Sequence, residues 1–313
     1  MNGHKWALLL AAFLAAGGIW AMPQAREPES LRLVTALAVD SGGEVSVTAV
    51  TGVRSSENEE PEVLKGTGDS LTAACGDLRE RSARRAYLGQ TQQLLVGEGQ
   101  NVEPILDFVV EHRELRLDTL LYIVKGAAGP ALEASAQMAA AETGGRDPRG
   151  ITVGEVLPRL AEGEYALVPA LASGEDGRLA PAGWAALGEK GVAGYLEADA
   201  ALGAALLNGK VRGQAVTLPD GGVELISSRC WAKEGKLNCA LIARAAEGRP
   251  SREALETWGN GVLQAALNKG WDCWGLGRET AFFSPWDWER NKNLDVSALT
   301  IQVEGELRRG EKG

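Results

Sequence analysis

The chain has 313 residues, too many for one typical domain, and 45% of them are hydrophobic, enough to build packed cores. Its formal net charge of −10 disfavours contact with phosphate backbones, so nucleic acid is not an expected partner. The histidines are His4 and His112, and the spacing of the four cysteines fits no zinc motif. We therefore expect no metal site.

The N-terminus has the pattern of an export signal. Lys5 precedes the run Trp6–Met22, 17 residues without a charge, which is the short end for crossing a bilayer. The pattern predicts a signal peptide or a single membrane anchor over residues 1–25, and leaves open whether it is cleaved. The rest of the chain should then lie at the outer face of the cytoplasmic membrane. The residues that would anchor it are Trp6, Leu10, Phe13 and Trp20.

The first segment, residues 26–143, reads as an α/β domain. The predicted elements in chain order are a hairpin of strands at 31–40 and 45–53, a loop at 55–62, a helix at 71–82 capped by Asp69 and Ser70, a strand at 94–97, a helix after Asn101 and a strand at 117–124. The apolar face of the second helix contains Val102, Ile105, Leu106, Val109 and Val110. This ββαβαβ order predicts helices packed on a mixed sheet.

The remaining chain divides at Gly144–Gly150, after a helix over Ala131–Ala141. A small middle domain, residues 144–209, should hold a helix at 151–160, a strand at 165–171, a hairpin at 183–195 and a helix at 197–207. A C-terminal α+β domain, residues 210–313, should hold strands at 211–218, 223–232 and 237–245, a helix from Ser251 to Leu267 and a strand at 296–307. The expected fold is therefore α/β and α+β, with three small mixed-sheet domains in series after the N-terminal signal or anchor helix.

The order of these segments resembles the Ger(x)C family, the C subunit of bacterial spore nutrient germinant receptors. The segments that carry the likeness are the Arg26–Asp40 opening, Gly68–Ser70 with the strand Leu94–Glu98, the helix and strand at Leu106–Val124, Gly183–Gly209, and Gly270–Gly277 with Pro285-Trp286 and the strand at 296–310. The resemblance implies a non-enzymatic role in nutrient-triggered germination. It also implies assembly with two membrane subunits, A and B, of which B is transporter-like.

The chain departs from the family at its N-terminus. Members of the family that the chain resembles usually have a lipobox cysteine just before the Arg-Glu segment, whereas the first cysteine here is Cys75, within a predicted helix. A chain without that thiol cannot form the lipid thioether. Attachment to the membrane would then fall to an uncleaved Trp6–Met22 helix or to the partner subunits.

Cys230 and Cys239 form a candidate disulfide. If Glu234-Gly235 is a two-residue hairpin turn, Lys233 pairs with Lys236 and, counting back, Cys230 faces Cys239 as a non-hydrogen-bonded pair. The Cα separation of such a pair, about 4.5 Å, is at the short edge of disulfide geometry. The alternative is a pair of free thiols in a sheet.

Other motifs favour structural roles. Cys75 and Cys273 lie in apolar surroundings, and His112 lies at the polar end of a helix, so none is expected to be catalytic. The glycines at 97, 99, 275 and 277 fit turns and complete no nucleotide-binding fingerprint, so no cofactor is expected. Trp271 and Trp274 are expected in the core. Trp286 and Trp288 are candidates for a partner surface.

The alternative to a receptor subunit is an exported solute-binding protein or a cell-envelope hydrolase. An exported solute-binding protein would have two lobes joined by several crossings of the chain, and a cell-envelope hydrolase would need a nucleophile or metal. The sequence offers one hinge-like break, at Gly144–Gly150, and no such nucleophile or metal set.

Overall fold

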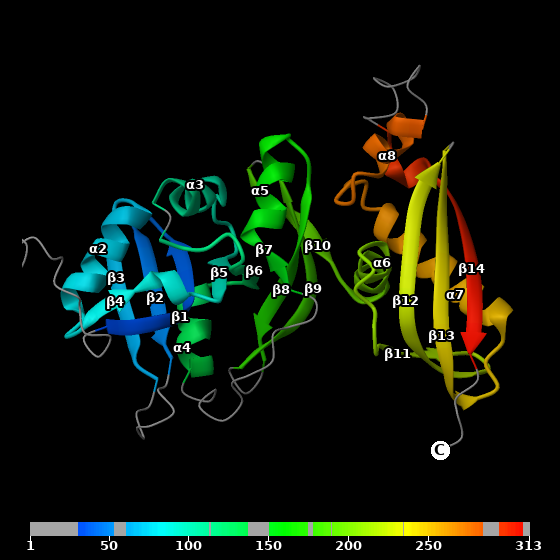
Figure 1. The fold of residues 1–313 in the computed structure, drawn as a ribbon, viewed down its shortest axis with the longest axis horizontal. Coiled ribbons are helices and arrows are strands. Elements are labelled where there is room, and N and C mark those ends of the chain that lie inside the picture. The colour runs from blue at the N-terminus through cyan, green and yellow to red at the C-terminus, as the bar shows by residue number, and fades with distance from the viewer. Residues whose placement is uncertain are drawn as a thin grey trace, which may run out of the picture.

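The structure is a computed structural model, which describes residues 31–52, 61–112, 114–136, 150–174, 178–188, 190–233, 235–283 and 294–308. Its strands form two sheets, which lie at opposite ends of the long axis (Figure 1). The chain enters the second sheet only after completing the first. All strands of the first sheet lie within residues 31–196, and those of the second within residues 215–308.

The first sheet has ten strands, of which eight follow the order β10-β9-β8-β6-β5-β1-β2-β3. Their bounds are β1 Leu31–Ser41, β2 Val45–Thr51, β3 Val63–Gly68, β4 Arg85–Tyr87, β5 Gln93–Gly97, β6 Leu120–Lys125, β7 Ile151–Thr152, β8 Ala166–Ser173, β9 Leu179–Gly188 and β10 Gly191–Leu196. The centre, β1-β5-β6-β8, is parallel, and both flanks are antiparallel hairpins.

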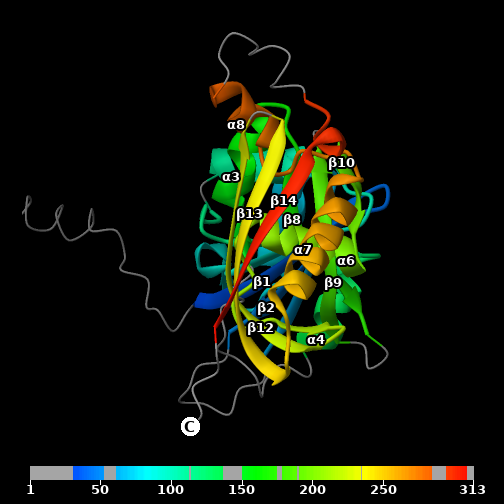
Figure 2. The ribbon, with the colours of Figure 1, turned by 90° about the vertical axis from the view of Figure 1, so that its right-hand side faces the viewer.

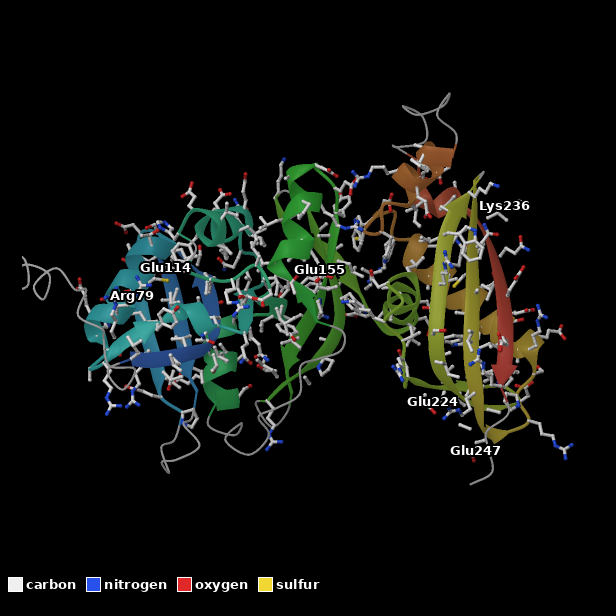
Figure 3. All side chains as sticks on the ribbon, viewed as in Figure 1. Arg79, Glu114, Glu155, Glu224, Lys236 and Glu247 are labelled. Atoms are coloured by element: carbon white, nitrogen blue, oxygen red, sulfur yellow. The ribbon has the colours of Figure 1, made fainter. Side chains whose placement is uncertain are left out.

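Helices cover both faces of this sheet because its strands alternate between two apolar sets. Leu37 and Val39 of β1 face the side of α2 (Leu71–Arg81) and α3 (Glu103–His112), whereas Ala36 and Ala38 face α4 (Ala128–Ala136). An ion pair between Arg79 and Glu114 fastens α2 to the segment after α3 (Figure 3). A further helix, α5 (Val153–Ala161), packs beside β7 and β8.

The second sheet has four strands in the order β11-β12-β13-β14. Their bounds are β11 Ala215–Leu218, β12 Gly221–Lys233, β13 Lys236–Gly248 and β14 Thr300–Arg308. α6 (Ala198–Leu207) and α7 (Arg252–Leu267) cross each other and pack against the strands, and α8 (Leu276–Phe283) lies along β12. Figure 2 shows the twist of this sheet with α7 beside it.

Most predicted elements are confirmed, with local caps as expected. The Ser70 hydroxyl accepts the Ala73 N–H at 3.2 Å at the start of α2, and the Ser251 hydroxyl accepts the Ala254 N–H at 3.1 Å at the start of α7. The mixed α/β and α+β fold is also as predicted. Part of the expected loop at 55–62 lies outside the described residues.

Five details differ from the sequence predictions. The ββαβαβ order omits β3 and β4, and the family-like ending contains the helix α8. Val110 is 52% exposed because α3 buries Phe108 in its place. Leu117 is 54% exposed because β6 begins only at Leu120, and β14 begins at Thr300 because residues 296–298 form a 3-10 turn.

The predicted first and middle domains share one sheet. Ile123 of β6 pairs with Ala170 of β8, and Leu121 pairs with Ile151 of β7, so ladder contacts join the two sides of the Gly144–Gly150 break. The boundaries at 143/144 and 209/210 remain predictions. The sheets themselves divide the described residues into two units.

Candidate functional site

Asp40 lies where α/β proteins commonly bind ligands. β1, β5 and β6 are parallel neighbours, so their carboxyl ends meet at one edge of the sheet. At this edge Asp40 Oδ1 accepts the N–H of Ala128 and Oδ2 accepts the N–H of Gly129, both at 2.7 Å. The start of α4, where backbone N–H groups favour an anion, is therefore filled by a carboxylate of the chain itself.

Two glycines make room for this carboxylate. A Cβ at Gly97 would lie 2.1 Å from Asp40 Oδ1, and one at Gly129 would lie 2.7 Å from Thr48 Oγ1 and 3.0 Å from Asp40 Oδ2. No larger residue fits at either position without moving its neighbours. The carboxyl edge is thus packed closed around Asp40, which gives this aspartate a structural role.

A second polar cluster lies beside it and joins β6 to β10 and α6. Lys125 forms an ion pair with Glu197 and its Nζ lies 4.6 Å from the ring centroid of Tyr195. The hydrogen bond from Lys125 lowers the pKa of Glu197. Burial, followed by the nearby Glu98 carboxylate, raises the pKa of Tyr195, so this phenol stays protonated at neutral pH.

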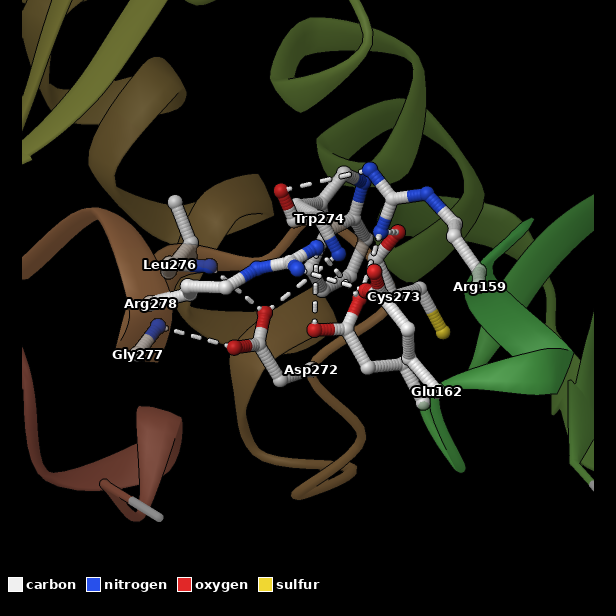
Figure 4. Close-up of polar contacts among 9 residues, drawn as sticks. Arg159, Glu162, Asp272, Cys273, Trp274, Leu276, Gly277 and Arg278 are labelled. Carbon is white, nitrogen blue, oxygen red and sulfur yellow. Dashed lines mark hydrogen bonds and ion pairs between the residues drawn. The ribbon is translucent and has the colours of Figure 1, made fainter. Parts of the chain in front are cut away.

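The two units meet at a polar junction between α5 and the segment that leads into α8 (Figure 4). Arg159 of α5 donates from Nη1 to the carbonyl of Cys273 at 2.9 Å and from Nη2 to that of Trp274 at 3.5 Å. Glu164 lies 3.9 Å from the same guanidinium. Arg159 therefore acts as a brace that satisfies backbone carbonyls across the junction.

Ion pairs and a cap complete the junction. Arg278 of α8 reaches back to Glu162 at 2.5 Å and to Glu164 at 3.2 Å. Asp272 accepts the N–H groups of Leu276 at 2.9 Å and Gly277 at 2.8 Å, which caps the start of α8. Arg278 thus links the two units through ion pairs, and Asp272 orders the start of the helix from which Arg278 projects.

Close packing of α6 against α7 adds to the polar contacts at the junction between the two units. Gly203 of α6 lies so close to α7 that a Cβ there would sit 2.0 Å from the carbonyl oxygen of Val262. The hydroxyl of Ser228 in β12 donates to the Leu206 carbonyl at 2.7 Å, and Lys210 Nζ donates to the Gly150 carbonyl at 2.7 Å. α6 is therefore held by both units.

Cys230 and Cys239 face each other in the register that the hairpin predicts. Cys239 is buried, and Cys230 is half-buried with its Sγ 3.7 Å from the carbonyl oxygen of Leu206. The contact with Cys239, together with burial, raises the pKa of the Cys230 thiol. Both residues are thiols in the structure, so the disulfide remains a prediction.

The other candidate residues occupy structural positions where they are described. Cys75 is 1% exposed, and burial raises the pKa of its thiol to about 12. Cys273 is also buried, and Trp271 and Trp274 are partly buried against the core. His112 contacts Thr72 Oγ1 at 3.1 Å and the Phe108 ring. The anchor residues Trp6, Leu10, Phe13 and Trp20, and the surface candidates Trp286 and Trp288, lie outside the described residues.

A cavity of about 420 Å³ opens between the start of α2 and α3. Asp69, Asp107, Glu111 and His112 contribute to its lining. Within the described ranges, no group of three histidine, cysteine or carboxylate side chains is arranged to hold a metal ion. No described helix is long and apolar enough to cross a membrane.

Sequence reasoning did not identify Asp40 or Arg159 as key residues. Asp40 reads only as the end of a strand, and its partners lie 88 and 89 positions away along the chain. The available signal was the small-residue stretch Gly126–Gly129 after β6, typical of a close backbone approach. For Arg159 the sequence carries no comparable signal, because its partners are backbone carbonyls.

Comparisons with known proteins agree with this architecture. Residues 24–141 match a family described as the spore germination protein N-terminal domain. The fold is similar to the crystal structure of the GerBC protein, with a TM-score of 0.54 and 15% sequence identity over 87% of this chain and 96% of that one. No curated protein sequence matches the chain. Residues 24–141 thus contain a spore germination protein N-terminal domain, and the chain as a whole has a GerBC-like fold.

Proposed function

We propose that the chain is the extracytoplasmic C subunit of a spore germinant receptor and acts without catalysing a reaction. In this role it docks on the outer face of the membrane-embedded A and B subunits. It helps to assemble or stabilise the receptor that converts nutrient binding into germination. The observation that carries the proposal is the spore germination domain at residues 24–141 within a GerBC-like fold.

The closed carboxyl edge supports a structural role over a catalytic one. In an α/β enzyme this edge would be open to substrate, whereas here Asp40 accepts two of the free N–H groups at the start of α4. The buried thiols of Cys75 and Cys273 are poor nucleophiles, because burial raises their pKa and keeps them from forming the reactive thiolate.

The connection between the sheets argues against a solute-binding protein. Each described sheet is built from one continuous stretch of chain, so the chain passes between the units once, through α6. Bilobed binding proteins open and close about several crossings. This junction is instead braced by Arg159, Arg278 and the close α6–α7 contact.

Membrane attachment is part of the proposal. We assign it to the apolar segment Trp6–Met22, or to the partner subunits, at the outer face of the spore inner membrane. The A and B subunits are expected to be encoded by genes for multipass membrane proteins beside this one.

The test is deletion of the gene, with any paralogous genes, in the native spore former. Germination is then followed with single nutrients, and tagged wild-type protein is located by spore fractionation. We expect loss of the response to particular nutrients, unchanged germination with a non-nutrient trigger, and tagged protein in the inner membrane fraction together with two multipass proteins. Normal germination with every nutrient and no protein in spores would refute the proposal.

A further inference from the structure

The pair formed by Cys230 and Cys239 lies in the centre of the second sheet. Its position is fixed by the hairpin β12–β13, in which Lys233 pairs with Lys236, Ala232 with Leu237 and Trp231 with Asn238. Pairs in an antiparallel ladder alternate between hydrogen-bonded and non-hydrogen-bonded. Counting from the turn, Ala232–Leu237 and Cys230–Cys239 are both of the non-hydrogen-bonded kind.

A contact outside the hairpin supports this assignment independently. The N–H of Ala232 donates to Glu279 of α8 at 2.9 Å, so it points away from β13. The irregularities in the ladder lie at Gly222/Val223 and Leu225/Ser227, so none intervenes between Ala232 and Cys230. Cys230, two residues before Ala232, therefore also belongs to a non-hydrogen-bonded pair.

Non-hydrogen-bonded pairs bring opposing side chains closest, with Cα atoms about 4.5 Å apart. Disulfides span Cα separations of about 4.4–6.8 Å, so a pair of this kind lies within their range, at its short end. The two residues already face each other in the ladder, and both side chains pack with the same core. The other two cysteines, Cys75 and Cys273, belong to α2 and to the junction.

We propose that Cys230 and Cys239 are a modification site at which a cross-strand disulfide closes the β12–β13 hairpin. Two S–H bonds break and one S–S bond forms, and a small disulfide such as oxidised glutathione takes the two electrons and two protons to give two thiols. The bond would hold the strand that contacts α6 through Ser228 to the centre of the sheet, and so preserve the surface on which the two units meet. The location outside the cytoplasmic membrane, which rests on the proposed function, would provide the oxidising conditions that such a bond needs.

The pair should oxidise as the sheet forms and change slowly afterwards. Exchange requires a thiolate, and the folded environment keeps the Cys230 thiol protonated. Alkylation of the native protein therefore cannot separate a disulfide from two buried thiols. The thiols must be counted after denaturation.

The experiment refolds the full chain in a glutathione buffer that is mostly oxidised, quenches it with acid, and denatures it in a maleimide reagent without reductant. We expect Cys75 and Cys273 alone to be labelled, and all four cysteines after reduction. Cys230→Ser should leave Cys239 labelled without reductant, whereas Cys75→Ser should leave the 230–239 bond intact. Labelling of all four cysteines in the wild type, or glutathione bound to Cys230, would overturn the proposal. The result does not depend on the receptor role, because no partner or germinant is present.

Discussion

The carboxylate of Asp40 accepts a 2.7 Å hydrogen bond from the backbone N–H of Gly129, which joins the end of β1 to the start of α4. The same side chain accepts the N–H of Ala128. One residue thus satisfies two of the donors that a helix start leaves free. It also occupies the edge of the sheet at which open α/β enzymes commonly bind their ligands.

We therefore expect Asp40→Ala to destabilise the protein by about 2–3 kcal/mol, the cost of two unpaired N–H groups and a lost helix cap. Asp40→Asn should cost about half as much, because its one acceptor oxygen serves one of the two donors. Urea unfolding followed by circular dichroism measures both. Asp118→Ala is the control, since its side chain is 54% exposed and pairs with the exposed Arg116. Equal midpoints for Asp40→Ala and the control would contradict the assigned role.

Gly203 and Gly261 are a matched pair for testing the α6–α7 crossing. A Cβ at Gly203 would lie 2.0 Å from the Val262 carbonyl oxygen, whereas one at Gly261 would have no heavy atom within 4 Å. Gly203→Ala should therefore destabilise the protein by about 1–3 kcal/mol, because the added methyl group overpacks the crossing. Gly261→Ala should stabilise by about 0.5–1 kcal/mol, because alanine favours the helix. If Gly203→Ala raises the melting temperature as Gly261→Ala does, α6 and α7 are not in close contact at Gly203.

The Arg159 brace predicts how the two units separate. Arg159→Ala leaves the carbonyls of Cys273 and Trp274 without their donor, at a cost of about 1–2 kcal/mol for a charged donor that is partly exposed. Arg159→Lys should recover only part of this, because one ammonium cannot serve both carbonyls in the same geometry. Amide hydrogen exchange should rise at residues 272–277 in Arg159→Ala and stay unchanged in Arg244→Ala, an exposed arginine of β13. If amide exchange at residues 272–277 is unchanged in Arg159→Ala, the Arg159 hydrogen bonds do not stabilise the junction.

Local elements were predictable because their signals lie within a few residues. Ser70 and Ser251 precede apolar periodic stretches, and the two-residue turn sets the facing positions of Cys230 and Cys239. β3 was missed because its Gly66 and Gly68 are poor strand residues. Gly66 is needed there because a Cβ would lie 2.3 Å from the Ala74 carbonyl oxygen of α2, a contact that no local pattern encodes.

The shape of the whole sheet depended on long-range pairing. The Gly144–Gly150 break reads as a domain boundary, yet β6 pairs with β8 across it. A parallel pair requires a long crossover, so the sequence between the strands carries no register signal. The same distance along the chain hides the partners of Asp40, so the ordered segments carry a family resemblance but do not reveal which residues close the carboxyl edge of the sheet.

Glu256 gives the second unit a specific dependence on pH. Its carboxylate accepts the N–H of Gly305 on β14 at 2.9 Å and the Nε of Arg252 at 2.7 Å, and these contacts lower its pKa, the Gly305 bond most. A carboxyl group with a lowered folded-state pKa stabilises the fold at pH values above the ordinary glutamate pKa of about 4.3. That stabilisation is lost as the pH falls through the lower folded-state value.

The melting temperature of Glu256→Gln should therefore lie below that of the wild type by a constant amount from about pH 8 to pH 5, and the gap should narrow as the pH falls below about 4. Glutamine can still accept the Gly305 N–H but carries no charge for Arg252, so the gap reports the ionised form. Glu247→Gln is the control, because Glu247 is exposed at the end of β13 (Figure 3). A gap that persists unchanged at pH 3 would mean that Glu256 supports β14 through packing alone, and that its charge does not hold the closing strand to α7.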